Sequence, residues 1–161
     1  TACSWPRAEL TALSYQVDPR RPEAAALRDE LAETTTNRER SLVIAKRIER
    51  DGGFCLMALA DCLGEAQTTH HRANRGSGGS KVLDHPANLV AVCTVCNGQA
   101  EDASALIRFD LIERGLRVEK AATNAATLER AKRTPVEYLT GQRWFLISDT
   151  ERRHEDEEWT T

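Results

Sequence analysis

The sequence is poor in aromatic residues and contains no long hydrophobic run. Aromatic residues make up 5% of the 161 positions, so aliphatic and alanine side chains have to supply most of the core. The longest nearly apolar segment, residues 54–63, is interrupted by Asp61 and is much shorter than the ~20 residues that span a bilayer. The first residues lack the basic stretch, apolar stretch and cleavage site of a secretory signal. We therefore expect a globular, cytoplasmic protein with no membrane partner.

Acidic residues are absent from one part of the chain and concentrated in another. The formal net charge of −3 disfavours a polyanionic partner when it is taken alone. However, the five acids and two bases of residues 151–161 account for all of that charge. Residues 66–83 contain no acid and include Arg72, Arg75 and Lys81. This stretch is either an ordinary solvated loop or a surface that faces nucleic-acid phosphates.

Two short helical patterns define an N-terminal extension, residues 1–36. The first pattern covers residues 6–13 and the second covers residues 22–32, with apolar side chains on one face of each. Residues 34–37 are threonines and an asparagine, which favour a break in the helix and a new N-cap. We therefore place a domain boundary near Thr36.

The next segment, residues 37–115, contains all of the unusual spacings. Its clearest helical pattern runs from Asn97 to Gly115, with apolar residues at four-residue steps and acids in the first turn. The remaining segment, residues 116–161, is expected to be an annex with a short strand, a helix, a hairpin and a mobile acidic end, at residues 116–118, 121–133, 136–147 and 154–160.

Four of the five cysteines form two pairs along the sequence. Cys93 and Cys96 are separated by two residues, so both thiolates can face one side of a turn and bind one tetrahedral Zn²⁺. Cys55 and Cys62 are separated by six residues, which requires a looped knuckle. The alternative is a redox-active or simply buried pair, and Cys3 is left as a free thiol. We predict a structural zinc site formed by the two pairs.

Two adjacent histidines, His70 and His71, lie between the cysteine pairs. Asn88 follows in the same segment, and Asn97 comes directly after Cys96. Each has a structural alternative, because histidines are often packed or solvated, Asn97 suits a helix N-cap and Asn88 suits a turn. Neighbouring side chains on a regular strand point to opposite faces, so a shared site requires the strand to end or bulge at the histidine pair.

In this order, the residues resemble the HNH endonuclease family, of the ββα-metal type with an embedded zinc knuckle. The resemblance covers residues 50 to 112 and rests on the ordered motifs Cys55…Cys62, His70-His71, Gly78-Gly79, Pro86-Ala87-Asn88-Leu89-Val90 and Cys93-Thr94-Val95-Cys96-Asn97. The sequence is also similar to the small HNH proteins of actinobacterial phages, mainly through the loop at residues 72–79. Two features depart from the family pattern. The first cysteine pair has a long gap, and Asn97 stands where many members have histidine.

The resemblance implies a small α+β fold, with a zinc-stapled ββα core between N-terminal helices and a C-terminal helix plus hairpin. It implies hydrolysis of DNA phosphodiester bonds with His71 as the general base. His70 and Asn97 would hold one divalent ion, Mg²⁺ or Mn²⁺, at the scissile phosphate. Asn88 would brace the loop that orients His71. His85 is a rival ligand whose position before a proline suits loop packing better.

DNA is therefore the expected partner, and no small-molecule cofactor is expected. Arg72, Arg75 and Lys81 are the expected phosphate contacts, in a mode that does not read sequence. Two further functions stay open at this point: a non-cleaving zinc-containing module that binds DNA or protein, and a packaging accessory subunit that depends on a phage or bacterial protein partner. Intact His70, His71 and Asn97 favour the enzyme, because a pure binding module has no evident need for them.

Overall fold

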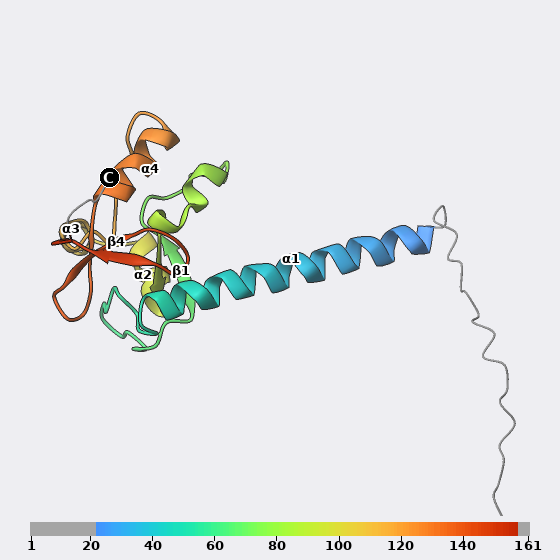
Figure 1. The fold of residues 1–161 in the computed structure, drawn as a ribbon, viewed down its shortest axis with the longest axis horizontal. Helices are drawn as coiled ribbons and strands as arrows, with labels where there is room; N and C mark the ends of the chain where they lie inside the picture. The colour runs from blue at the N-terminus through green and yellow to red at the C-terminus, as the bar shows by residue number, and fades with distance from the viewer. Residues whose placement is uncertain (1–21, 158–161) are drawn as a thin grey trace, which may run out of the picture. The chain divides into compact units, whose positions relative to one another are not determined.

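The computed structural model describes residues 22–157, in which the first element is the helix α1 (Pro22–Arg50) (Figure 1). The chain divides into two units at residues 39 and 40, and both units contribute residues to this helix. The helix pattern expected at residues 6–13 lies outside the described residues.

Helix α1 is continuous through residues 34–37, so the break that we expected there is wrong. The hydroxyl of Thr36 donates a hydrogen bond to the carbonyl oxygen of Ala32 at 2.9 Å. This bond satisfies the hydroxyl group within the helix. A capping role would instead have required the helix to begin at the threonines. The threonines therefore do not end the helix, although the division between the two units lies close to Thr36.

Beyond α1, the second unit is a mixed α+β structure with small antiparallel sheets. Its elements follow in the order β1 (Thr68–His71), η1 (Lys81–Asp84), η2 (Pro86–Asn88), β2 (Leu89–Val92), α2 (Thr94–Glu101), α3 (Ala105–Glu113), α4 (Asn124–Arg133), β3 (Val136–Glu137), β4 (Arg143–Leu146) and β5 (Arg152–His154).

Strands β1 and β2 form a two-stranded antiparallel sheet that leads directly into α2. His70 pairs with Val90 and His71 pairs with Leu89, and β1 ends at His71. All four residues of β2 are buried. Cys93 is the N-cap of α2, and its sulfur accepts a hydrogen bond from the backbone N–H of Cys96 at 3.3 Å.

The single helix expected from Asn97 to Gly115 is two helices, α2 and α3. Ser104 caps α3 by accepting a hydrogen bond from the backbone N–H of Ile107 at 3.4 Å. The apolar stripe continues across this break, which is why periodicity alone joined the two helices. The predicted stop at Gly115 is confirmed: its φ is +66°, and a Cβ at this position would collide with the backbone carbonyl of Pro135.

The annex contains the predicted helix, α4, and the predicted hairpin, β3 with β4. The sheet gains a third strand, β5, which we did not predict and which reaches into the segment expected to be mobile. The strand expected at residues 116–118 is wrong. The N–H of Arg117 bonds to the carbonyl of Leu111 and the N–H of Val118 bonds to the carbonyl of Arg72, so neither joins a ladder.

A buried polar network joins the end of α1 to both sheets. The guanidinium of Arg50 donates to both carboxylate oxygens of Asp51 at 2.7 and 2.9 Å and to the carbonyl of Leu89 at 2.6 Å. Asp51 also accepts from the hydroxyl of Tyr138 at 2.6 Å and from the backbone N–H of Ala91 at 2.8 Å. Buried charges require such partners, so this network fixes the two sheets against one another.

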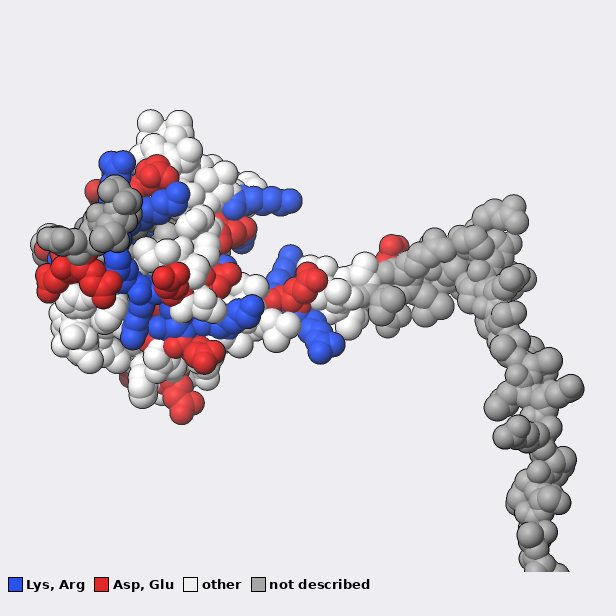
Figure 2. Space-filling view, in the orientation of Figure 1, with Lys and Arg blue, Asp and Glu red and all other residues white. Residues whose placement is uncertain are grey.

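Charge alone does not mark a binding surface on the face of the second unit that Figure 2 shows. There, Lys and Arg side chains are interspersed with Asp and Glu side chains. No helix in the described part of the chain is both long and apolar enough to cross a membrane. A functional site therefore has to be found from local geometry.

Candidate metal centre and adjoining histidine site

The four paired cysteines come together in the second unit. The sulfur atoms of Cys55, Cys62, Cys93 and Cys96 all lie within 4.8 Å of one another, and those of Cys62 and Cys93 are 3.9 Å apart. Tetrahedral Zn²⁺ with Zn–S bonds of ~2.3 Å separates its sulfur ligands by about 3.8 Å. The cluster therefore has the donor type and the spacing of a four-cysteine zinc site.

The long first knuckle is built as a loop that reverses the chain. Cys55 donates its backbone N–H to the carbonyl of Gly64 at 2.8 Å, and Cys62 donates to the carbonyl of Leu59 at 3.2 Å. Ala58 and Asp61 within this loop have positive φ angles of 48° and 60°. These tight turns absorb the six-residue gap, as the looped knuckle predicted from the sequence requires.

The surroundings of the cysteines affect their protonation in different directions. Burial raises the pKa of the Cys55 and Cys96 thiols. At Cys93 burial also acts to raise the pKa, but hydrogen bonding with the backbone of Cys96 outweighs it, and the pKa falls below its usual value. A thiolate is thus favoured at the N-cap of α2, and the thiolate is the form that binds a metal.

His70 and Asn97, which are far apart in the sequence, meet beside this cluster. Nδ1 of His70 and Oδ1 of Asn97 are 2.9 Å apart. Asn97 is not the N-cap of α2, because Cys93 occupies that position. The capping alternative for Asn97 is therefore excluded, and its side chain is directed at the end of β1.

His71 faces a different partner. Its Nε2 atom is 2.9 Å from Oδ1 of Asp84, and the same carboxylate accepts hydrogen bonds from Nη1 of Arg75 at 2.9 and 3.1 Å. Asp84 is the first acid after the acid-free stretch, which is the only sequence signal that could have pointed to it. We did not predict Asp84 as part of the site.

Both histidines favour the neutral form. Burial lowers the pKa of His70, and the hydrogen bond with Asn97 opposes this shift only in part. Burial also lowers the pKa of His71, against the hydrogen bond with Asp84. Neutral imidazole is the form that can bind a metal or accept a proton.

Asn88 is fully buried and holds the loop that runs from β1 to η1. Its Oδ1 accepts from the backbone N–H of Ala73 at 2.8 Å, and its Nδ2 donates to the carbonyls of Ala73 and Leu83 at 3.0 and 2.9 Å. Its backbone carbonyl accepts from the N–H of Arg72 at 2.8 Å. A plain turn residue would not make this set of buried bonds, so the turn alternative is excluded.

The structure corrects our prediction that Arg72 contacts phosphate. The side chain is 1% exposed and donates to four backbone carbonyls, those of Gly115 at 2.6 Å, Ala87 at 2.7 Å, Ala131 at 3.1 Å and Thr134 at 2.7 Å. Burial lowers the pKa of its guanidinium to about 9, which leaves it charged near neutrality. Because its donors are used inside the protein, Arg72 is a structural residue.

The other two predicted phosphate contacts lie on the surface. Arg75 is exposed and lines the hollow beside His70 and Asn97, where it is paired with Asp84. Lys81 is exposed at the start of η1. In the described part of the chain it lines neither of the two hollows that contain His70 and His71. His85 accepts a hydrogen bond from the backbone N–H of Ala87 at 3.1 Å, which agrees with the loop-packing role.

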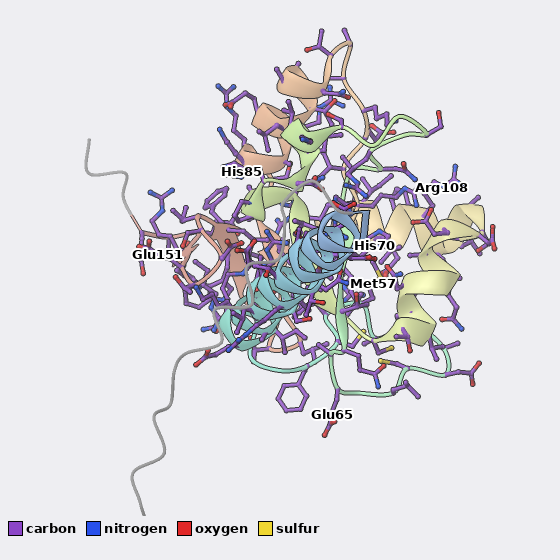
Figure 3. All side chains as sticks on the ribbon, turned by 90° about the vertical axis from the view of Figure 1, so that its right-hand side faces the viewer. Met57, Glu65, His70, His85, Arg108 and Glu151 are labelled. Carbon is purple, nitrogen blue, oxygen red and sulfur yellow. The ribbon has the colours of Figure 1, made fainter. Side chains whose placement is uncertain are left out.

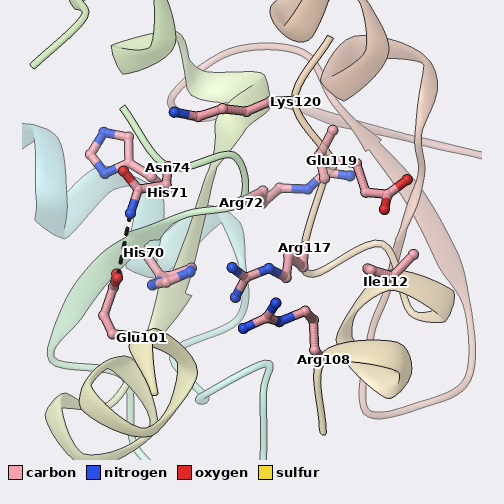
Figure 4. A pocket seen from close by; sticks show the side chains of 11 residues that line it. His70, His71, Arg72, Asn74, Glu101, Arg108, Ile112, Arg117, Glu119 and Lys120 are labelled. Carbon is pink, nitrogen blue, oxygen red and sulfur yellow. Dashed lines mark hydrogen bonds between the residues drawn. The ribbon is translucent and has the colours of Figure 1, made fainter. Parts of the chain in front are cut away.

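A hollow of about 420 Å³ opens beside the histidine pair. Figure 4 shows Arg108 and Arg117 directed toward His70, and Glu101 bonded to Asn74. Neither arginine belongs to a motif in the sequence, and nothing in the pattern of residues 101–120 placed them near the histidines. Comparisons with models of protein families, with curated proteins and with solved structures found no match to this chain.

Proposed function

We propose that this protein is a metal-dependent endonuclease that hydrolyses phosphodiester bonds in DNA. The observation that carries the proposal is the contact between His70 and Asn97, next to His71 and beside the four-cysteine cluster. The atoms of these two side chains that could bind a metal, Nδ1 and Oδ1, are 2.9 Å apart. Two antiparallel strands followed by a helix supply these residues, in the order β1, β2 and α2. That order supports assignment to the ββα-metal type suggested by the sequence.

The two donors fit a divalent ion. Two adjacent ligands of an octahedral ion with bonds of ~2.1 Å lie about 3.0 Å apart, close to the observed distance between His70 Nδ1 and Asn97 Oδ1. A protein site with few ligands suits Mg²⁺, which keeps several waters and binds substrate phosphate, and the mixed nitrogen and oxygen donors also suit Mn²⁺. When bound, such an ion neutralises charge on the scissile phosphate and stabilises the leaving oxygen.

His71 acts as the general base in this proposal. Its Nε2 atom is engaged by Asp84, so an Nε2–H donated to that carboxylate leaves Nδ1 free to accept a proton from the attacking water. Burial lowers its pKa and keeps the imidazole neutral, as a base requires. Asn88 holds the loop that places Asp84 and His71 opposite one another.

Zinc has a structural role in this proposal. The four cysteines would take all four positions around the ion and leave no open site for substrate. The ion would tie the long knuckle to the start of α2, and Asn97 projects from that helix. The four-cysteine cluster would serve a non-cleaving binding module equally well, so the histidine site is what favours the enzyme.

The test is cleavage of supercoiled plasmid by the zinc-loaded full chain with Mg²⁺ or Mn²⁺. We expect nicked or linear product from the native chain, and none from His71→Ala or when the divalent ion is withheld. His85→Ala is the matched control, because His85 packs in a loop outside the histidine hollows, and it should cleave as the native chain does. A folded, zinc-loaded native chain that leaves plasmid and single-stranded DNA intact would support the binding-module function instead.

A further inference from the structure

We infer that Arg108, Arg117 and Lys120 form a binding site for a DNA phosphate next to the one that would be cleaved. The inference rests on the proposed function, because it places this phosphate on the same strand as the scissile one. These three residues take the place of Arg72 as the expected phosphate contacts, because the donors of Arg72 are used inside the protein.

Three cations from two segments converge on one hollow. Arg108 projects from α3, Arg117 follows Gly115, and Lys120 lies further along the same loop, and all three line the hollow that contains His70. Figure 4 shows the two guanidinium groups pointing the same way, toward His70, with Lys120 above them. Figure 3 shows Arg108 and His70 on the same side of the second unit.

The two carboxylates of this hollow do not form ion pairs with the two arginines. Glu101 is within hydrogen-bond distance of the side-chain amide of Asn74, at 3.4 Å. Glu119 also lines the hollow, but its carboxylate points away from Arg117 and Arg108 in Figure 4. Within the described residues, neither arginine forms an ion pair. Two like charges placed together, neither of them in a direct ion pair, favour an anion between them.

The donors of this cluster are available to a ligand. The guanidinium of Arg108 is exposed and has no hydrogen-bond partner among residues 22–157. Arg117 uses Nη1 for the carbonyl of Ala100 at 3.1 Å, which orients the group and leaves its other nitrogens free for a second acceptor. Planar guanidinium groups bind phosphate oxygens in pairs.

The position of Lys120 extends the cluster toward the loop that carries Arg75. A Cβ placed on Gly76 would lie 3.4 Å from Nζ of Lys120, so the ammonium group lies against this glycine-rich loop. The cations thus run from Arg108 past the histidines to Arg75. A chain of phosphates spaced along a strand fits such a line of cations better than a single small anion does.

The test measures binding of a fluorescently labelled DNA duplex by anisotropy, over a series of salt concentrations with Mg²⁺ present. All proteins carry His71→Ala, which prevents cleavage under the proposed function. The variants are Arg108→Gln, Arg117→Gln and Lys120→Gln. Arg133→Gln is the matched control, because Arg133 is exposed at the end of α4 and does not line the hollow.

We expect each cluster variant to bind several-fold more weakly and to lower the slope of log Kd against log salt by about one, for duplexes of unrelated sequence. The control should retain the native slope. Arg108→Gln should not disturb the fold, because the guanidinium is exposed and makes no internal bond in the described part of the chain.

The outcomes separate this inference from the nuclease proposal. Cluster variants that bind DNA with the same affinity and slope as the control would overturn the phosphate site, even if the native chain cleaves DNA. If the native chain fails to cleave but the cluster variants lose binding, the nuclease proposal fails and the DNA-binding site stands. Circular dichroism and zinc content, unchanged in each variant, confirm that the comparison is between folded proteins.

Discussion

Nε2 of His71 lies 2.9 Å from Oδ1 of Asp84. Asp84 is held in turn by Arg75, whose Nη1 donates to both of its carboxylate oxygens. A histidine bonded through one ring nitrogen has a defined tautomer and orientation, so the other nitrogen has a fixed role. In the proposed enzyme, Asp84 is therefore a positioning residue for the general base.

Asp84→Asn should lower the cleavage rate by about 10- to 100-fold, which is part of the 10²–10⁴-fold that a general base contributes. The amide can donate to Nε2 and so favour the wrong tautomer. KM and zinc content should be unchanged, because Asp84 touches neither DNA nor the cysteines in the proposal. Asp110→Asn is the control, because Asp110 is an exposed acid on α3 that lines neither of the hollows containing the histidines. An unchanged rate in the Asp84 variant would remove the positioning role.

The cleavage rate should fall on the acid side of its pH profile as His71 becomes protonated. Because burial lowers the pKa of His71, the midpoint of this fall should lie below the ordinary value of about 6.5. The measurement is the single-turnover rate between about pH 5 and pH 8, with bound zinc determined at each point. A rate that does not change over this range would contradict the assignment of His71 as base.

Removal of one zinc ligand should unfold the second unit. Structural zinc contributes apparent binding free energies of about 10–16 kcal/mol in zinc-finger peptides, so Cys93→Ser should lose the metal and lower Tm by more than about 10 °C. The native chain should contain one zinc per chain by elemental analysis. Cys3→Ser changes the cysteine that belongs to neither sequence pair; it is the control and should retain the zinc. A Cys93 variant with native Tm would show that the cluster holds no structural metal.

Arg72→Met should reduce the free energy of unfolding by about 3 kcal/mol or more, because buried carbonyls that lose their donor are costly. Arg75→Met, at a nearby exposed position, should change it by no more than about 1 kcal/mol. Urea denaturation of the zinc-loaded proteins provides the comparison. Equal stabilities for the two variants would mean that the carbonyls around Arg72 find other partners.

The histidines should also make stability depend on pH. Burial lowers the pKa of His70 and His71 in the folded state. Below the ordinary histidine pKa of about 6.5, the unfolded state therefore binds more protons than the folded state does. The free energy of unfolding should therefore decrease as pH falls below that value, and these groups should contribute no change above it. His70→Gln should reduce this dependence, as measured by urea midpoints at matched zinc content. The same acid dependence in His70→Gln would place its origin elsewhere.

Local signals were sufficient for several parts of the fold. The hairpin of β3 and β4 follows from two β-rich runs around a glycine-containing turn, and α4 ends where Pro135 prevents a longer helix. The spacing of Cys93 and Cys96 predicted a metal-binding turn, and the structure brings both cysteine pairs together. These features depend on residues close together in the sequence.

The remaining features depend on contacts between distant segments. Asp84 contacts His71 across a loop that Asn88 holds through a hydrogen bond to the carbonyl of Leu83. The side chain of Arg72 is bound by carbonyls up to 62 residues away in the sequence. The break between α2 and α3 was missed because the apolar stripe does not change there. Arg72 has the residue type of a phosphate contact, but its position in the fold makes it an internal hydrogen-bond donor.

The bonds of Arg72 have a consequence for shortened forms of the protein. One guanidinium joins the loop before β2, the turn after α3 and the end of α4, through Ala87, Gly115 and Thr134. A fragment that stops at residue 115, where the motifs end, would keep this buried cation and lose half of its acceptors. The smallest stable fragment that carries the histidine site therefore has to extend through α4, and a protease should not release the annex from a folded core.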